Sequence, residues 1–213
     1  MPDVQPELPA TTLGEYCYQA MFYQCSYLTK APRLPATELT NGCYADMFAG
    51  CVALRNALEL PSTDITEDCY YDMFGACENL EMPPVLSATT IAPGCYGNMF
   101  NGCTYLERVT RLPATTLETG CYYGMFAFTY ITNAPNLYVD TLVEQCYREM
   151  FLECNRLKYI KCRANNISAN DCLTNWVQGV ASNGRFVRRN GTNIWPSGNN
   201  GIPNGWTVEQ SYN

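Results

Sequence analysis

The feature that most constrains this chain is a nine-residue segment that recurs at a fixed distance. CYQAMFYQC occupies residues 17–25, and nearly the same letters return at residues 43, 69, 95 and 146. A period of 20 to 50 residues is typical of a protein built from stacked structural repeats. The first cysteines of the aligned copies are Cys17, Cys43, Cys69, Cys95, Cys121 and Cys146, spaced by 26 residues four times and then by 25.

A decayed seventh copy follows the six clear ones. Cys172 lies 26 residues after Cys146, and residues 175–180 occupy the place that residues 98–103 hold in the fourth copy. Terminal repeats are commonly atypical because one of their faces has no neighbour. We therefore predict one repeat domain over residues 1–182, with its degenerate last copy at 163–182, followed by a distinct segment at 183–213.

The spacing inside each copy predicts a short helix. Cys17, Met21 and Cys25 fall at i, i+4 and i+8, and Tyr18 and Phe22 flank that stripe, as on an amphipathic helix. The short segments that follow, LTKAP, LRNAL, LERVT, ITNAP and LKYIK, contain residues compatible with β-strands. The predicted fold class is an α/β repeat, a solenoid of about seven strand-turn-helix units of 25–26 residues.

The repeat resembles a known family. The order CxxLxxA…LP…L…CYxxMFxxC is similar to the leucine-rich repeats of the BspA-like type, found in surface proteins of gut and oral anaerobes, over about residues 8–180. The resemblance implies a right-handed leucine-rich-repeat-like solenoid and a surface adhesion or interaction module. This chain departs from the family pattern by an extra cysteine at the start of the predicted helix and by a slightly longer unit.

The cysteines of the repeated segment are predicted to be buried thiols. In copy five we align Phe128 with the second cysteine, and in copy seven Val180 takes that place, so an apolar side chain suffices there. Two cysteines eight residues apart on a helix lie about 12 Å apart along its axis, whereas a disulfide requires Cα atoms within about 7 Å. A bridge between Cys162 and Cys172, near the C-terminal end, remains an open alternative.

Composition excludes several kinds of function. The chain contains no histidine, which removes Ser-His-Asp and Cys-His catalysis and mixed Cys/His zinc sites. Its 20 acidic against 13 basic residues make nucleic acid an unexpected partner. No apolar stretch approaches the roughly 20 residues of a membrane span, and MPDVQPELPATTL lacks the pattern of a signal peptide. We expect a protein that is not an enzyme, without cofactor or metal.

The segment at 183–213 is rich in Asn, Gly, Pro and Trp, and FVRR and WTVEQ within it are candidate short strands. One interpretation is a cap whose tryptophans cover the open end of the core, which a solenoid needs to stay soluble. The alternative is a carbohydrate site, with Trp195 or Trp206 exposed and stacking on a sugar.

A recognition surface is predicted where residues vary between copies on a constant frame. We propose as ligand-binding positions the second residues after each CxxL leucine: Lys30, Asn56, Met82, Arg108, Asn133 and Tyr159. The first residues after it form a flanking row that varies in the same way: Thr29, Arg55, Glu81, Glu107, Thr132 and Lys158. Glu81 and Glu107 occupy matching positions and are the one candidate acid/base pair.

Together these observations predict a non-catalytic binding module of a bacterial cell-surface or secreted protein, recognising a host extracellular protein or glycan. An alternative is a structural or receptor-binding component of a bacteriophage particle, which would place the chain in the virion. A third interpretation is a carboxylate-based glycan-processing enzyme, which would need two acids in a deep pocket. The sequence does not set the ligand or the oligomeric state.

Overall fold

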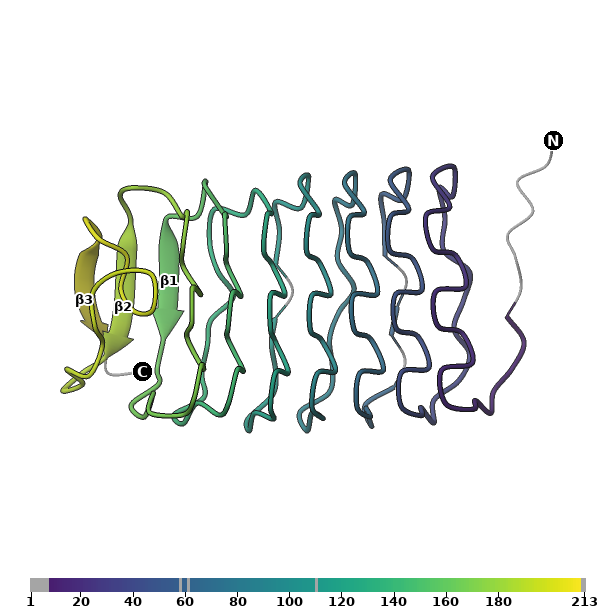
Figure 1. The fold of residues 1–213 in the computed structure, drawn as a ribbon, viewed down its shortest axis with the longest axis horizontal. Helices are drawn as coiled ribbons and strands as arrows, with labels where there is room; N and C mark the ends of the chain where they lie inside the picture. Colours follow the sequence, from purple (N-terminus) through teal and green to yellow (C-terminus); the bar gives the residue numbers. More distant parts are fainter. Residues whose placement is uncertain (1–7, 58, 61, 110, 212–213) are drawn as a thin grey trace.

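The computed structural model describes residues 8–57, 59–60, 62–109 and 111–211 of the chain. These residues form a row of similar coils stacked along the long axis of the molecule, with the three strands at its C-terminal end (Figure 1). We number the coils one to seven by their first cysteines, Cys17, Cys43, Cys69, Cys95, Cys121, Cys146 and Cys172. The first seven residues of the predicted repeat domain lie outside the described part.

The prediction of strand-turn-helix units is wrong, because the described residues contain no helix. In an α-helix every N–H would donate to the carbonyl four residues earlier. Here the N–H groups alternate between two partners. Those of Cys17, Gln19, Met21 and Tyr23 donate to the carbonyl three residues earlier in the same coil, while those of Tyr18, Ala20, Phe22 and Gln24 donate to carbonyls of coil two, 25 residues later.

The segment is therefore a run of overlapping turns, and its backbone conformation excludes a helix. Every fourth residue has a positive φ, as at Tyr16, Ala20 and Gln24, whose φ angles are 55°, 53° and 56°. A positive φ at the third residue of a turn is the requirement of type II turns, whereas helices need negative φ throughout. The same three places have positive φ in each of the seven coils.

Two ladders of aromatic rings form the centre of the stack. Successive tyrosines stack with ring centroids 5.9–6.2 Å apart, and successive phenylalanines with centroids 5.5–6.1 Å apart. Both ladders end on Trp176 of coil seven, which packs against Tyr147 and Phe151. The ladders consist of Tyr18, Tyr44, Tyr70, Tyr96, Tyr122 and Tyr147, and of Phe22, Phe48, Phe74, Phe100, Phe126 and Phe151.

All thirteen cysteines are free thiols, and all but Cys17 and Cys25 of coil one are buried. Cys162 and Cys172 are both free, so the open alternative of a bridge between them is not found. The alignment of Phe128 with the second cysteine is wrong. Phe128 is 46% exposed, whereas Thr129, eight residues after Cys121, is fully buried and occupies that place.

The strands are fewer than predicted. A parallel sheet of order β1-β2-β3 joins β1 (Tyr159–Cys162), β2 (Arg185–Arg189) and β3 (Thr207–Ser211). Of the five segments expected to form strands only LKYIK does so; in the described part of the others there are isolated bridges, such as Asn56 with Met82. LKYIK begins the one copy without a proline before its next cysteine, and proline cannot donate to a strand ladder.

The C-terminal segment covers the last coil. The strands predicted at FVRR and WTVEQ are confirmed as β2 and β3. Above coil seven, the N–H of Asn175 donates to Asn200 Oδ1, the N–H of Val177 to Asn199 O, and Trp176 Nε1 to Gly201 O. In the part of the chain that the structure describes, no helix has the length and apolar character to cross a membrane.

Candidate functional site

The six predicted ligand positions form a continuous line along one side of the stack, which we call the exposed row. Asn56 bridges Met82 in the next coil, and Asn133 bridges Tyr159. Five of the six side chains are exposed, and Tyr159 is half-buried. The structure therefore brings together, coil by coil, residues that are 25 or 26 positions apart in the sequence.

The flanking row is exposed as well, although a strand would have turned one of the two rows inward. The backbone gives the reason at coil three. The N–H groups of Glu81 and Met82 both donate to the carbonyl of Arg55, so the chain turns there instead of alternating as a strand does. Each coil consequently offers two adjacent side chains to a partner where the sequence predicted one.

The two rows enclose a shallow hollow in the middle of the molecule. It has a volume of about 350 Å³ and is lined by Glu81, Met82, Tyr105, Glu107 and Arg108. Tyr105 is 62% exposed and Met82 45% exposed, so an apolar floor lies between charges of both signs. Exposed aromatic and methionine side chains beside an arginine are the residue types enriched where proteins bind partners.

Ion pairing explains why the two glutamates do not act as a chemical pair. Glu81 Oε1 accepts a hydrogen bond from Arg55 Nη1 at 2.8 Å, across the exposed surface. Glu107, one coil further on, is also exposed. A general acid needs an enclosed, apolar setting that raises its pKa, and this open hollow does not provide one. The arrangement suits binding better than acid/base chemistry.

Sequence reasoning missed Tyr105, which lies directly before the CxxL leucine of coil four. The same place holds Tyr27 and Tyr130, which are 94% and 36% exposed. In coil six it holds Arg156, whose guanidinium carbon lies 4.4 Å from the centre of the Tyr130 ring. The signal available in the sequence was an aromatic residue recurring at a place that otherwise varies from copy to copy.

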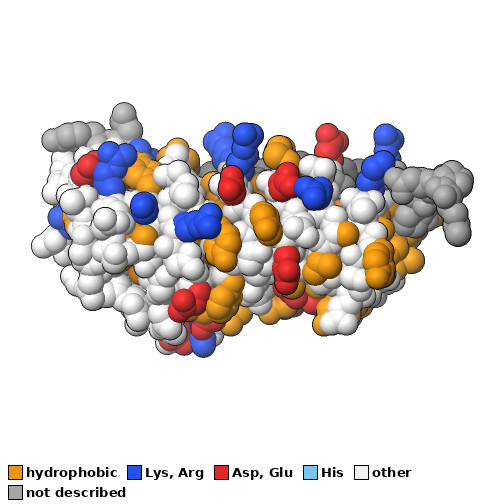
Figure 2. Space-filling view, turned by 90° about the horizontal axis from the view of Figure 1, so that it is seen from above, with side chains coloured by type: hydrophobic (Ala, Val, Ile, Leu, Met, Phe, Trp, Pro, Cys, Tyr) orange, Lys and Arg blue, Asp and Glu red, His pale blue; other side chains and the backbone are white. Residues whose placement is uncertain are grey.

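The surface around the rows is mixed in character. Figure 2 shows one side of the molecule, on which hydrophobic side chains lie in small groups among separate acidic and basic ones. At the C-terminal end of the exposed row, the Arg185 guanidinium carbon lies 4.9 Å from the centre of the Tyr159 ring and covers part of it.

The two tryptophans offered as sugar-stacking residues are not on the surface. Trp195 and Trp206 are 8% and 7% exposed. The ring of Trp195 stacks on Trp176 with centroids 5.7 Å apart and meets Phe186 edge-on, and Trp206 Nε1 donates to the carbonyl of Ala181. Both rings are packed within the C-terminal segment, so their faces are not available to a sugar.

A second hollow, on the side of the overlapping turns, was not predicted. It measures about 350 Å³ and includes Asp72, Asn98 and Asn101 among its lining residues. Burial raises the pKa of Asp72 to about 7, and the charge and hydrogen bond of Asp46, at the same place one coil earlier, raise it further in the same direction. The repeat places two carboxyl groups in register, and this stacking accounts for the shift.

The described residues contain no group of three or more Cys, Asp or Glu side chains arranged to hold a metal ion. Burial raises the pKa of Cys51 to about 11 and those of Cys95 and Cys146 to about 12. These thiols are therefore protonated near neutral pH, whereas nucleophilic and metal-binding cysteines act as thiolates. Their arrangement serves packing.

Comparisons with known proteins add nothing to this description: no family model, no curated protein and no solved structure matches the chain.

Proposed function

We propose that this protein is a non-catalytic binding module of a bacterial cell-surface or secreted protein, and that it recognises a host extracellular protein or glycan through the exposed row. The observation that carries the proposal is the contrast between frame and surface. The CYxxMF side chains are almost constant and, from coil two onward, buried, while the exposed row and the flanking row differ in every coil.

The central hollow adds a place for a ligand to settle. Glu81, Met82, Tyr105, Glu107 and Arg108 combine an apolar floor with hydrogen-bonding groups of both charges. Binding sites commonly pair an apolar surface with a few polar groups that fix orientation. The resemblance to the BspA-like repeats points in the same direction through its sequence alone, since the strand-turn-helix unit that it implied is not found.

The test is a binding screen of the purified chain against arrays of glycans and extracellular-matrix proteins. The variant Lys30→Ala/Arg108→Ala/Tyr159→Ala removes three members of the exposed row, and we expect it to lose saturable binding while it unfolds like the wild type. The matched control is Glu38→Ala/Asp64→Ala, which changes two exposed residues outside both rows. No binding to any array, or binding that the triple variant retains, would contradict the proposal.

A further inference from the structure

The charge of this acidic chain is distributed unevenly. Its net charge is −7, yet residues 148–189 carry eight of the 13 Lys and Arg and only three of the 20 Asp and Glu. The basic residues of this stretch are Arg148, Arg156, Lys158, Lys161, Arg163, Arg185, Arg188 and Arg189, and its acidic residues are Glu149, Glu153 and Asp171. The C-terminal end is thus a basic region on an acidic molecule.

Three of these cations meet on the outer side of the sheet, at the carboxyl ends of β1 and β2. Lys161 and Arg163 alternate with the buried Ile160 and Cys162 along β1 and therefore point away from the core. Lys161 pairs with Val187 in the register of β1 and β2, which places Arg163 beside Arg189 on the neighbouring strand.

One carboxylate partly neutralises this group. Asp140 lies 3.2 Å from Arg189 Nη1 and 3.8 Å from Arg163 Nη2. Two guanidinium groups in adjacent strands repel each other, and a single carboxylate between them with an ammonium nearby leaves an excess of two positive charges. On the other side of β2, Arg188 Nη1 donates to Asn193 Oδ1, but its buried Nε has no hydrogen-bond partner.

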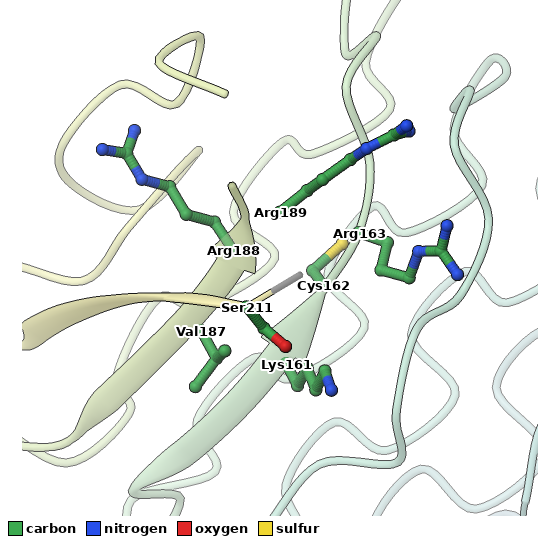
Figure 3. Close-up of a pocket in the computed structure, with 7 residues that line it drawn as sticks. All are labelled: Lys161, Cys162, Arg163, Val187, Arg188, Arg189 and Ser211. Atoms are coloured by element: carbon green, nitrogen blue, oxygen red, sulfur yellow. The ribbon is translucent and has the colours of Figure 1, made fainter. Parts of the chain in front are cut away.

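These side chains surround a small hollow. Its volume is about 60 Å³, and its lining comprises Lys161, Cys162, Arg163, Val187, Arg188 and Arg189 together with Ser211. Figure 3 shows the Ser211 hydroxyl close to Lys161, with Arg163 and Arg189 extending on the same side and Arg188 on the opposite side of β2. Hydroxyl, ammonium and guanidinium groups together are the donors that proteins use to bind oxyanions.

We propose that this basic cluster, Lys161, Arg163, Arg189 and Ser211, binds a tetrahedral oxyanion group, the sulfate or phosphate ester of a sugar. The inference rests on the proposed function and narrows it, because it names the charged group that a glycan ligand would present to the C-terminal end of the exposed row. Tyr159 and Arg185, two residues before Lys161 and Val187 on the same strands, would flank the sugar ring.

The acidic remainder of the chain limits the length of the ligand. Residues 1–147 carry sixteen acidic against five basic residues, so a long polyanion running along the stack would meet repulsion beyond coil six. A single ester group on an otherwise neutral sugar avoids this cost, whereas a nucleic acid strand, with a charge on every nucleotide, does not.

The experiment titrates the intact chain at low salt with glucose 6-sulfate, glucose 6-phosphate, inorganic sulfate and glucose, and follows backbone amide shifts by NMR. We expect saturable shifts centred on residues 161–163 and 187–189 with the sugar esters and none with glucose. Arg189→Gln should weaken ester binding at least tenfold because a charge-assisted contact is lost. Asp140→Asn should strengthen it several-fold, since it removes the competing carboxylate.

The matched control is Arg33→Gln, an exposed arginine in coil one, which should bind as the wild type does. Equal binding of glucose and its esters, unchanged affinity in Arg189→Gln, or weaker binding in Asp140→Asn would each overturn the inference. Inorganic sulfate binding as tightly as the esters would overturn the sugar assignment, and preference for a short oligonucleotide would overturn the glycan class. Failure here together with array binding that depends on the exposed row would leave the proposed function standing.

Discussion

At the scale of the residue, the second cysteine of each coil has a defined polar role. The thiols of Cys51, Cys77 and Cys103 each lie 3.1 Å from the carbonyl oxygen of the phenylalanine 29 residues earlier, to which they donate. In coil five Thr129 replaces this cysteine, and its hydroxyl donates to Phe126 O at 2.8 Å. Sequence reasoning predicted burial but missed the donor, because the misplaced Phe128 suggested that any apolar group would serve.

This role predicts different costs for two substitutions of similar size. Cys103→Thr should be tolerated, because a hydroxyl can donate to a phenylalanine carbonyl as that of Thr129 does. Cys103→Val fills similar space without a donor and should cost about 1 kcal/mol more of the free energy of unfolding. Urea unfolding measures the difference. Cys25→Val, at an exposed place, is the control, and equal stability of the two Cys103 variants would refute the hydrogen bond's contribution.

At the scale of the element, the overlapping turns explain why a helix was predicted. A spacing of four residues returns nearly to the same side of a helix of 3.6 residues per turn, and it returns to the same side of a ribbon that repeats every four residues. Cys17, Met21 and Cys25 fit both. The distinguishing signal was the residue before each cysteine and the places four and eight further on, which are often Gly, Asn or Asp, residues that tolerate positive φ.

The turn ribbon predicts opposite effects at two equivalent places in adjacent coils. Gly102 has φ +74° and Ala76 has φ +52°. Gly102→Ala should lose about 1 kcal/mol through backbone strain alone, because the nearest atom to an added Cβ, Ala76 Cα, is at an ordinary 3.5 Å. Ala76→Gly should gain stability by the same relief. Thermal unfolding tests both, with Gly14→Ala as control, and a neutral Gly102→Ala would argue against the turn conformation.

The stacked carboxyl groups predict a pH effect. The pKa of Asp72 is raised from 3.8 to about 7, so the folded state holds a proton that the unfolded state has released. Its contribution to stability is therefore complete below pH 4 and is lost as the pH rises through 7. Asp72→Asn, the residue that coil four carries as Asn98, should remove this loss and stabilise the protein by about 1–2 kcal/mol at pH 8, after allowance for partial exposure.

Unfolding free energies of Asp72→Asn and wild type, measured from pH 4 to 8, check this prediction. The difference between the two proteins should grow with pH. Asp64→Asn, an exposed aspartate outside the turn ribbon, should give a constant difference. Parallel profiles for wild type and Asp72→Asn would show that Asp46 and Asp72 do not share a proton.

At the scale of the whole molecule, the sequence revealed which residues correspond but not the backbone that relates them. The period located Tyr105, Met82 and Arg108 within their copies, yet exposure of both rows depended on the turn at Glu81 that no spacing predicts. The C-terminal segment shows the reverse case. Its strands were predictable from FVRR and WTVEQ, while the burial of Trp195 arises from Trp176, where both aromatic ladders end.

The central claim is that a constant buried frame carries a separate recognition surface. One variant tests it directly: Glu81→Ser/Met82→Ser/Glu107→Ser/Arg108→Ser, which rewrites the central hollow and leaves the CYxxMF segments intact. Its thermal midpoint and its affinity for the tightest array ligand are measured side by side with the wild type. We predict a midpoint within about 2 °C of the wild type and a loss of binding. Unchanged binding, or a protein that no longer folds, would contradict the separation of frame and surface.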